Sequence, residues 1–361
     1  MHRNRFAICA MVAAACGLVL VGCRYAMVNS DLAAMQGDQN SSDSEPAVSA
    51  TPSPNAPEKT NPLDPARAYE YLKAICDLGP RISGSPGMTK QQQLLTEHFE
   101  KLGGKVRRQE FTIRHPQTGQ PVTITNLIVQ WHPESKERVL LAAHYDTRPW
   151  PDRDPNVRKR TSGTFIGAND GGSGTAVLME LAHFMPQLKG KYGVDFLLLD
   201  AEEFVYKDAN RTLGIAGDQY FIGSEYFARD YVANPPEYRY RWGVLLDMVG
   251  DRKLQIYQEK NSTWWTDTKP LVDDIWATAR RLGVREFIAK RKHEVEDDHL
   301  RLRNIAKIPT CDIIDFEYPV EQNRTPGGKY WHTEADTLDK CSGESLVKVG
   351  WVILEWLATA R

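Results

Sequence analysis

Apolar residues follow two different spacings along the chain, and the two alternate from about residue 66 to the C-terminus. Short apolar runs at 139–143, 194–199 and 243–247 are typical of strands that are buried on both faces, as in a parallel sheet. Helical spacing predicts helices between or beyond these runs, at 66–78, 88–102, 177–182, 219–227, 271–282 and 345–357. Strands that alternate with helices predict one α/β domain, with helices on both faces of the sheet.

Three further strands complete the predicted sheet. Residues 108–113 and 122–131 are predicted to be antiparallel, because a turn-rich segment at 115–119 separates them. The last strand is expected at 307–316. The central sheet is therefore expected to be mixed but mostly parallel.

The first 22 residues have the pattern of an export signal. Arg3 and Arg5 precede an apolar run at 6–22. Residues 20–23, Leu-Val-Gly-Cys, resemble the lipobox of bacterial lipoproteins, in which Cys23 is acylated after cleavage. We expect a lipoprotein-type signal peptide at 1–22 and a mature protein that is lipid-anchored at the bacterial cell envelope, in the periplasm or at the cell surface. Soluble export is one alternative, and an uncleaved membrane anchor is another, because the run is just long enough to span a bilayer.

Residues 23–63 are predicted to be a disordered tether. From about residue 30 this segment consists largely of Ser, Pro, Asn, Ala and Asp, with almost no large apolar side chains. The folded domain is therefore expected at 64–361.

Composition narrows the class of protein without identifying it. The 361 residues are 41% hydrophobic and 25% charged, with a net charge of -2, which is ordinary for a globular protein. The balanced charge offers no general electrostatic case for nucleic-acid binding. The folded part contains only Cys76, Cys311 and Cys341, without the CxxC spacing of a zinc–sulfur site. One disulfide and three free thiols are both compatible with this pattern.

Histidines and acids stand at the ends of the predicted strands. In open α/β sheets, ligands bind beyond the carboxyl ends of the strands. Taken singly, each of these residues has an ordinary explanation as a cap, a turn residue or an ion-pair partner. Together they form the ligand set of a zinc site with nitrogen and oxygen donors. The residues are His144, Asp170, Glu202, Glu203 and Asp247, with His332 in a later loop.

The same residues carry a family resemblance. The segments His144-Tyr-Asp, Gly-Ala-Asn-Asp170-Gly-Gly-Ser-Gly, Asp-Ala-Glu202-Glu, Leu-Asp247-Met and Trp-His332-Thr occur in this order. In order and approximate spacing they resemble the motifs of zinc aminopeptidases of the peptidase family M28 type. The resemblance covers the chain from about Pro65 onward. It implies an α/β/α sandwich with a zinc site at the carboxyl edge of the sheet.

The resemblance also implies a role for each residue. Glu202 matches the general base, and Asp146 matches a carboxylate that orients His144. His144 and Asp247, with a shared Asp170, match the ligands of the second zinc in two-metal peptidases. The ligands of the first zinc are matched by Asp170, Glu203 and His332.

A narrower resemblance points to the glutaminyl cyclases, which convert an N-terminal glutamine to pyroglutamate and release ammonia. It rests on Val295-Glu-Asp297-Asp-His, on the segment 308–314 and on Trp331 directly before the last histidine. In that family Asp297 matches an acid that hydrogen-bonds the counterpart of Asp247 and so keeps it from a second metal. Trp331 matches an indole that contacts the substrate amide, and Val295 a hydrophobic contact beside it.

We therefore expect a glutaminyl-peptide cyclotransferase (an acyltransferase) that acts as a monomer on peptides or proteins with N-terminal glutamine. One zinc is expected, with two as the alternative. A zinc aminopeptidase is the alternative function, because the residues after Trp331 resemble the peptidases equally. Ala143 and Ala168 also replace a disulfide that is common in secreted animal cyclases. A non-catalytic, lipid-tethered binding protein is the second alternative.

Overall fold

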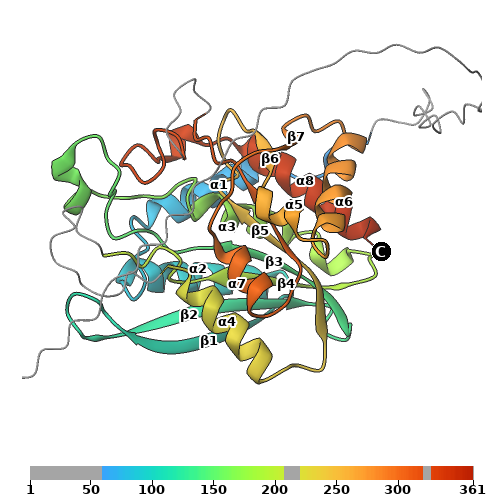
Figure 1. Cartoon of the computed structure of the whole chain (residues 1–361), viewed down its shortest axis with the longest axis horizontal. Helices are drawn as coiled ribbons and strands as arrows, with labels where there is room; N and C mark the ends of the chain where they lie inside the picture. The colour runs from blue at the N-terminus through green and yellow to red at the C-terminus, as the bar shows by residue number, and fades with distance from the viewer. Residues whose placement is uncertain (1–58, 207–219, 320–326, 361) are drawn as a thin grey trace, which may run out of the picture. The chain divides into compact units, whose positions relative to one another are not determined.

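The computed structural model describes residues 59–206, 220–319 and 327–360 (Figure 1). The predicted signal peptide, Cys23 and nearly all of the predicted tether lie outside the described residues. Within the described ranges, we find no helix with the length and apolar character needed to cross a membrane.

Six strands form the central sheet (Figure 1). Strand β3 is parallel to β4 and β5, and β5 is parallel to β8, whereas β2 is antiparallel to both β1 and β4. The sheet is therefore mixed and mostly parallel, as the sequence predicts. Across the sheet the order is β1 (Lys105–Arg114), β2 (Pro121–Trp131), β4 (Gly193–Leu199), β3 (Glu137–His144), β5 (Arg239–Asp247) and β8 (Thr310–Ile314).

Helices cover both faces of this sheet. Alternate residues of β3 point to opposite faces, so that Val139 and Leu141 belong to one hydrophobic core and Leu140 and Ala142 to another. The first core packs against α1 (Pro65–Asp77), α2 (Pro86–Lys101), α3 (Gly172–Leu181), α6 (Lys269–Arg281) and α8 (Gly343–Thr359). The second core packs against α4 (Ile222–Ala233) and α7 (Asp298–Asn304), which lie together in Figure 1. The α/β/α sandwich is thus confirmed.

Helix starts follow the capping residues of the sequence. Asp64 accepts hydrogen bonds from the amides of Ala66 and Arg67 at the start of α1, and Ser85 does the same for α2. Proline occupies the first position of both helices, where no backbone donor is needed.

A buried ion pair aligns the three central strands. Arg138 of β3 donates from Nε to Asp195 of β4 at 3.0 Å, and both side chains are fully buried. Tyr240 of β5 donates its hydroxyl to the same carboxylate. Because the side chains of three strands meet at one point, the register of β3, β4 and β5 is held, and with it the relative position of their carboxyl ends.

Several elements are not evident from the sequence pattern. A separate parallel pair is formed by β6 (Ile256–Gln258) and β7 (Phe287–Arg291), and α5 (Lys260–Trp264) follows β6. Short 3-10 helices occur at Val157–Thr161, Met185–Gln187 and Leu338–Lys340. Most of these elements span only three to five residues, too few to show a period. Helix α4 starts at Ile222, later than expected, because Phe221 before it has a positive φ of 62°.

The three cysteines of the folded part are free thiols. Cys311 and Cys341 are buried and Cys76 is partly buried. Of the two states that the sequence allows, the structure therefore has the unpaired one.

Candidate active site

The central strands deliver the candidate residues to one edge of the sheet. His144 is the last residue of β3 and Asp247 the last residue of β5. Glu202 and Glu203 follow the end of β4 at Leu199. Because these three strands are neighbours and parallel, their carboxyl ends lie side by side.

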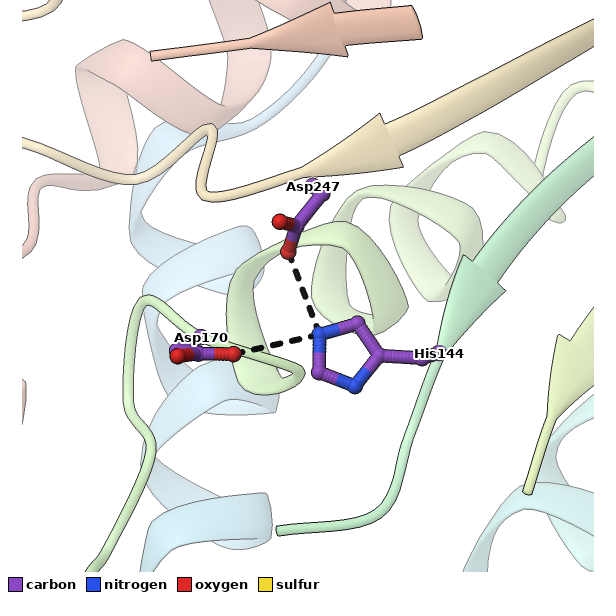
Figure 2. Close-up of side chains that lie close together, drawn as sticks. All are labelled: His144, Asp170 and Asp247. Carbon is purple, nitrogen blue, oxygen red and sulfur yellow. Dashed lines mark hydrogen bonds and ion pairs between the residues drawn. The ribbon is translucent and has the colours of Figure 1, made fainter. Parts of the chain in front are cut away.

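His144 lies between two carboxylates from different loops and strands. Its Nε2 atom is 3.2 Å from Oδ1 of Asp170 and 3.1 Å from Oδ1 of Asp247. Figure 2 shows the imidazole ring with both carboxylates directed at this nitrogen. Asp170 comes from the segment immediately before α3, so three separate parts of the chain form this group.

Asp170 belongs to a second group as well. Its Oδ2 atom is 3.4 Å from Nε2 of His332, and the same nitrogen is 3.4 Å from Oε1 of Glu203. In each of the two groups, the potential ligand atoms lie within 4.8 Å of one another. Asp170, Glu203 and His332, which match the ligands of the first zinc, thus lie close together. His144 and Asp247, which match ligands of the second zinc, lie close to the same Asp170.

The group of Asp170, Glu203 and His332 contains carboxylate oxygens without hydrogen-bond partners, which a cation could bind. Oδ2 of Asp170 and Oε2 of Glu203 are buried and have no hydrogen-bond partner. Burying a carboxylate oxygen without a partner is costly. Carboxylate oxygen and imidazole nitrogen are also the donors that zinc takes in catalytic sites. Asp170, Glu203 and His332 therefore fit a zinc ion.

The two histidines differ in their electrostatic surroundings. Burial, and then the positive charge of Arg148, lower the pKa of His332 well below its usual value, so the ring is neutral and able to bind a metal. Burial by itself would also lower the pKa of His144. The nearby carboxylates of Asp146, Asp170 and Asp247 outweigh that effect and raise this pKa well above the usual range. In the metal-free protein His144 therefore carries a proton.

Asp146 holds the turn that presents the adjacent glutamates. Its carboxylate accepts hydrogen bonds from the amides of Glu202 at 3.2 Å and of Glu203 at 3.0 Å. Its Oδ1 atom also lies 3.6 Å from Nδ1 of His144, which is beyond hydrogen-bond distance, so the orienting role of Asp146 stays a prediction. Burial, and then the charge of Glu203, raise the pKa of Glu202 well above that of an ordinary glutamate.

Unusual backbone conformations cluster at this edge of the sheet. Ala201, Met248 and His332 have positive φ angles of 59°, 51° and 58°, which cost energy for residues other than glycine. Each of them is a site residue or directly adjoins one. Gly171, after Asp170, has a φ of 79°, and a Cβ there would lie 2.6 Å from the carbonyl oxygen of Asp146. Only glycine is free of strain at that position.

A cavity of about 350 Å³ opens onto these residues. One wall is apolar and includes Trp331, whose ring meets the edge of Phe316 at a centroid distance of 5.1 Å. The guanidinium of Arg153 lies 4.0 Å from the centre of the same indole. Val295, Met248 and Ile314 belong to this wall too. Carboxylates line much of the rest of the cavity, together with Arg148, Arg153 and His332, so the cavity has an apolar side and a charged, mainly acidic side.

Asp297 lines the cavity and also begins a helix. It is the cap of α7, where its Oδ1 accepts a hydrogen bond from the amide of Asp298 at 2.6 Å. Burial, and then the charge of Asp247, raise the pKa of Asp297 well above that of an ordinary aspartate. A direct hydrogen bond between Asp247 and Asp297 stays a prediction.

Three further residues support the site and were not singled out from the sequence. Arg148 donates to Oε1 of Glu203 and, through Nε, to Asp152, at 2.9 Å each. Asp152 in turn lies 3.6 Å from Nδ1 of His332. Asp336 accepts hydrogen bonds from the amides of Asn169 and Asp170. These residues lie in irregular loops, so no periodic pattern marks them.

Replacing Asp152 with asparagine is expected to weaken zinc binding about 10- to 100-fold, the usual effect of losing a carboxylate that orients a metal-bound histidine. Competition for zinc with a chromophoric chelator measures the affinity directly. Asp339→Asn is the control, because Asp339 is exposed and pairs with Lys340. An unchanged affinity in Asp152→Asn would show that Asp152 does not orient His332.

The sequence matches the model of peptidase family M28 over residues 126–357. Among solved structures, glutaminyl cyclase of Fimbriiglobus ruber is 42% identical, with a TM-score of 0.76, over 84% of this chain and 97% of that chain. A Zn-dependent exopeptidase from Parabacteroides distasonis is 30% identical, with a TM-score of 0.74, over 83% of this chain and 100% of that chain. Glutaminyl-peptide cyclotransferase of Bothrops jararaca is 25% identical over 311 residues, 77% of each chain.

Proposed function

The chain belongs to peptidase family M28, and from this premise we propose that it is a zinc-dependent glutaminyl-peptide cyclotransferase. It would convert the N-terminal glutamine of peptides to pyroglutamate and release ammonia. One observation carries the proposal: of the three groups of potential ligands in the described part of the chain, only Asp170, Glu203 and His332 line the cavity completely, whereas His144, His299 and Asp312 of the other two groups are not part of its lining. The similarity to the glutaminyl cyclases supports the same activity.

One zinc per chain fits this arrangement. His332 is neutral and faces the cavity together with Asp170 and Glu203. His144 Nε2 and Asp247 Oδ1 lie 3.1 Å apart, so these two side chains contact each other directly. Bound by Asp170, Glu203 and His332, zinc would polarise the γ-carbonyl of the substrate glutamine as a Lewis acid.

In the proposed reaction, Glu202 moves the proton. As the α-amine nitrogen bonds to the γ-carbonyl carbon, Glu202 accepts one proton from that nitrogen. It returns this proton to the amide nitrogen as the carbon–nitrogen bond breaks, so ammonia leaves and Glu202 is restored. No external nucleophile is consumed, because the amine and the amide belong to one residue.

The remaining cavity residues position the substrate. Trp331 and Val295 present an apolar wall to the glutamine side chain. Asp247 and Asp297 lie on the acidic side, where two close carboxylates resist double ionisation. A shared proton between them would hold their oxygens in place beside the reacting amine.

Two measurements on the purified protein test the proposal together: zinc content by mass spectrometry, and products from a glutamine-initiated dipeptide. One zinc per chain, with ammonia released and the peptide bond intact, is the expected result. Two zincs with free amino acids and no pyroglutamate would instead establish an aminopeptidase.

The pH dependence of kcat is expected to show an acid limb that belongs to Glu202. Glu202 must be deprotonated to accept a proton, and its pKa is raised by burial. Activity therefore falls as the pH decreases, and it does so at a higher pH than an ordinary glutamate would give. The rate of ammonia release at saturating substrate, from pH 5 to 9, measures this limb. A kcat that stays constant down to pH 5 would contradict the assignment.

The aminopeptidase is the second candidate. It is favoured by one observation, the sharing of Asp170 between two groups of potential ligands, which is the layout of a two-metal site. In that case Glu202 would deprotonate a water molecule and a peptide bond would be cleaved. The similarity to the Parabacteroides distasonis exopeptidase supports this alternative.

We also propose that the protein is exported and held at the bacterial envelope by acyl groups on Cys23. The support is the charged start, the apolar run and the Leu-Val-Gly-Cys motif of the first 23 residues. A tether at 23–63 would then let the catalytic domain reach peptides away from the membrane.

A further inference from the structure

A second hollow of about 610 Å³ lies beside the active-site cavity. It is formed by strand β1 and helix α4, and we call it the β1–α4 groove. Tyr220 and Glu296 line both the groove and the cavity. The two spaces are therefore neighbours that share part of one wall.

The floor of the groove is aromatic and aliphatic. Phe111 of β1 and Tyr226 of α4 stack face to face, with a centroid distance of 3.8 Å and an interplanar angle of 8°. Ile113 and Ile222 extend this surface toward the active site. Tyr226 remains 38% exposed, so the stack offers an aromatic surface to a bound molecule.

The charged residues of the groove compensate one another. Glu225 pairs with Arg229 at 2.8 Å, and Glu296 pairs with Arg301 at 3.2 Å. Two acids and two bases leave no excess of either sign. The groove is therefore suited to an uncharged, apolar body rather than to a phosphate or a strongly charged segment.

Strand β1 also provides a free sheet edge. It pairs only with β2 among the strands of the described sheet and stands at one end of the strand order (Figure 1). Phe111 and Ile113 are half-buried and Thr112 between them is exposed, as expected for alternating faces of a strand. Such an edge can add an extended peptide through main-chain hydrogen bonds, while pockets beside it select side chains.

We propose that the β1–α4 groove binds the part of the substrate peptide that follows the reacting glutamine, in an extended conformation, and prefers an apolar or aromatic side chain there. The inference rests on the proposed function. The N-terminal residue of the substrate occupies the cavity, so the rest of the peptide must leave it. The groove is the adjoining space with an apolar floor and a free strand edge.

Ammonia release from a peptide series tests this subsite. The series contains a Gln-Ala dipeptide, a hexapeptide of glutamine followed by alanines, and hexapeptides in which one phenylalanine is moved through positions 2 to 6. We expect kcat/KM to be higher for the hexapeptides than for the dipeptide. One phenylalanine position should add about a tenfold gain, as partial burial of an aromatic side chain does.

Substitutions at Tyr226 locate the effect. Tyr226→Ala is expected to abolish the gain from phenylalanine and to leave kcat/KM for the dipeptide unchanged, since Tyr226 is not among the residues lining the described active-site cavity. Tyr226→Phe keeps the stacking ring and should keep the gain. Val232→Ala is the matched control, because Val232 is exposed on the same helix and does not line the groove as described.

The possible results separate the subsite from the proposed function. If the dipeptide is cyclised and kcat/KM is equal for all peptides, the subsite proposal is wrong, but the proposed cyclase activity is supported. An equal loss for dipeptide and hexapeptides in Tyr226→Ala would also overturn it, as a general structural effect. A dimer that Tyr226→Ala dissociates would make the groove a contact between two copies. No ammonia from any peptide would refute the proposed function, and the subsite with it.

Discussion

Replacing Glu202 with glutamine is expected to lower kcat for ammonia release by about 10²- to 10⁴-fold, the usual contribution of a general acid–base group. The neutral amide retains the shape of the side chain but cannot accept a proton from the attacking amine. Glu202 is not a member of any of the three groups of potential metal ligands in the described residues. The zinc content of the variant should therefore equal that of the parent protein.

The neighbouring residue offers a matched control. Glu203→Gln makes the same chemical change one position away, but Glu203 is a proposed zinc ligand. It should lose zinc as well as activity, whereas Glu202→Gln should lose activity alone. If Glu202→Gln kept more than about a tenth of the parent kcat, a group other than Glu202 would have to transfer the proton.

Replacing Asp170 with asparagine is expected to remove the zinc and nearly all activity. Asp170 is the residue that the two potential ligand groups share, and a neutral amide binds zinc far more weakly than a carboxylate does. The affinity loss should exceed the roughly 10- to 100-fold loss expected for residues that only orient a ligand. Zinc content after dialysis and affinity by chelator competition measure the effect, with thermal unfolding as the test for a retained fold.

The same substitution at Asp247 distinguishes one zinc from two. Asp247 belongs only to the group that contains His144. If one zinc is bound by Asp170, Glu203 and His332, Asp247→Asn should retain it. If the parent protein holds two zincs, Asp247→Asn should lose one of them. Such a loss would contradict the single-zinc proposal and favour the aminopeptidase.

The sequence predicts the central sheet well because buried strands leave a local signature. The runs that became β3, β4 and β5 are apolar without alternation, as expected for strands covered on both faces. The last strand lies within its predicted range of 307–316 but is shorter, since β8 covers only Thr310–Ile314. The pair β6 and β7 was missed, because strands of three and five residues carry too little pattern to identify.

Asp297 shows the limit of a local interpretation. In the sequence, the adjacent acids Asp297 and Asp298 have two alternative explanations, a helix start and a functional site. In the structure, Asp297 caps α7 and lines the cavity at the same time. The backbone hydrogen bond that caps the helix also restrains a carboxylate of the cavity lining, so the two explanations are compatible.

The α/β class and the chemical types of the candidate residues can be predicted from the sequence, because strand burial and motif order are properties of short segments. Which of these residues meet is a property of the folded chain: Asp170 lies between two histidines, Asp152 lies 3.6 Å from His332, and Arg148 contacts Glu203. These contacts join loops that are tens of residues apart. Their geometry depends on strand order and register, which are set by the packing of the whole sheet rather than by any one segment.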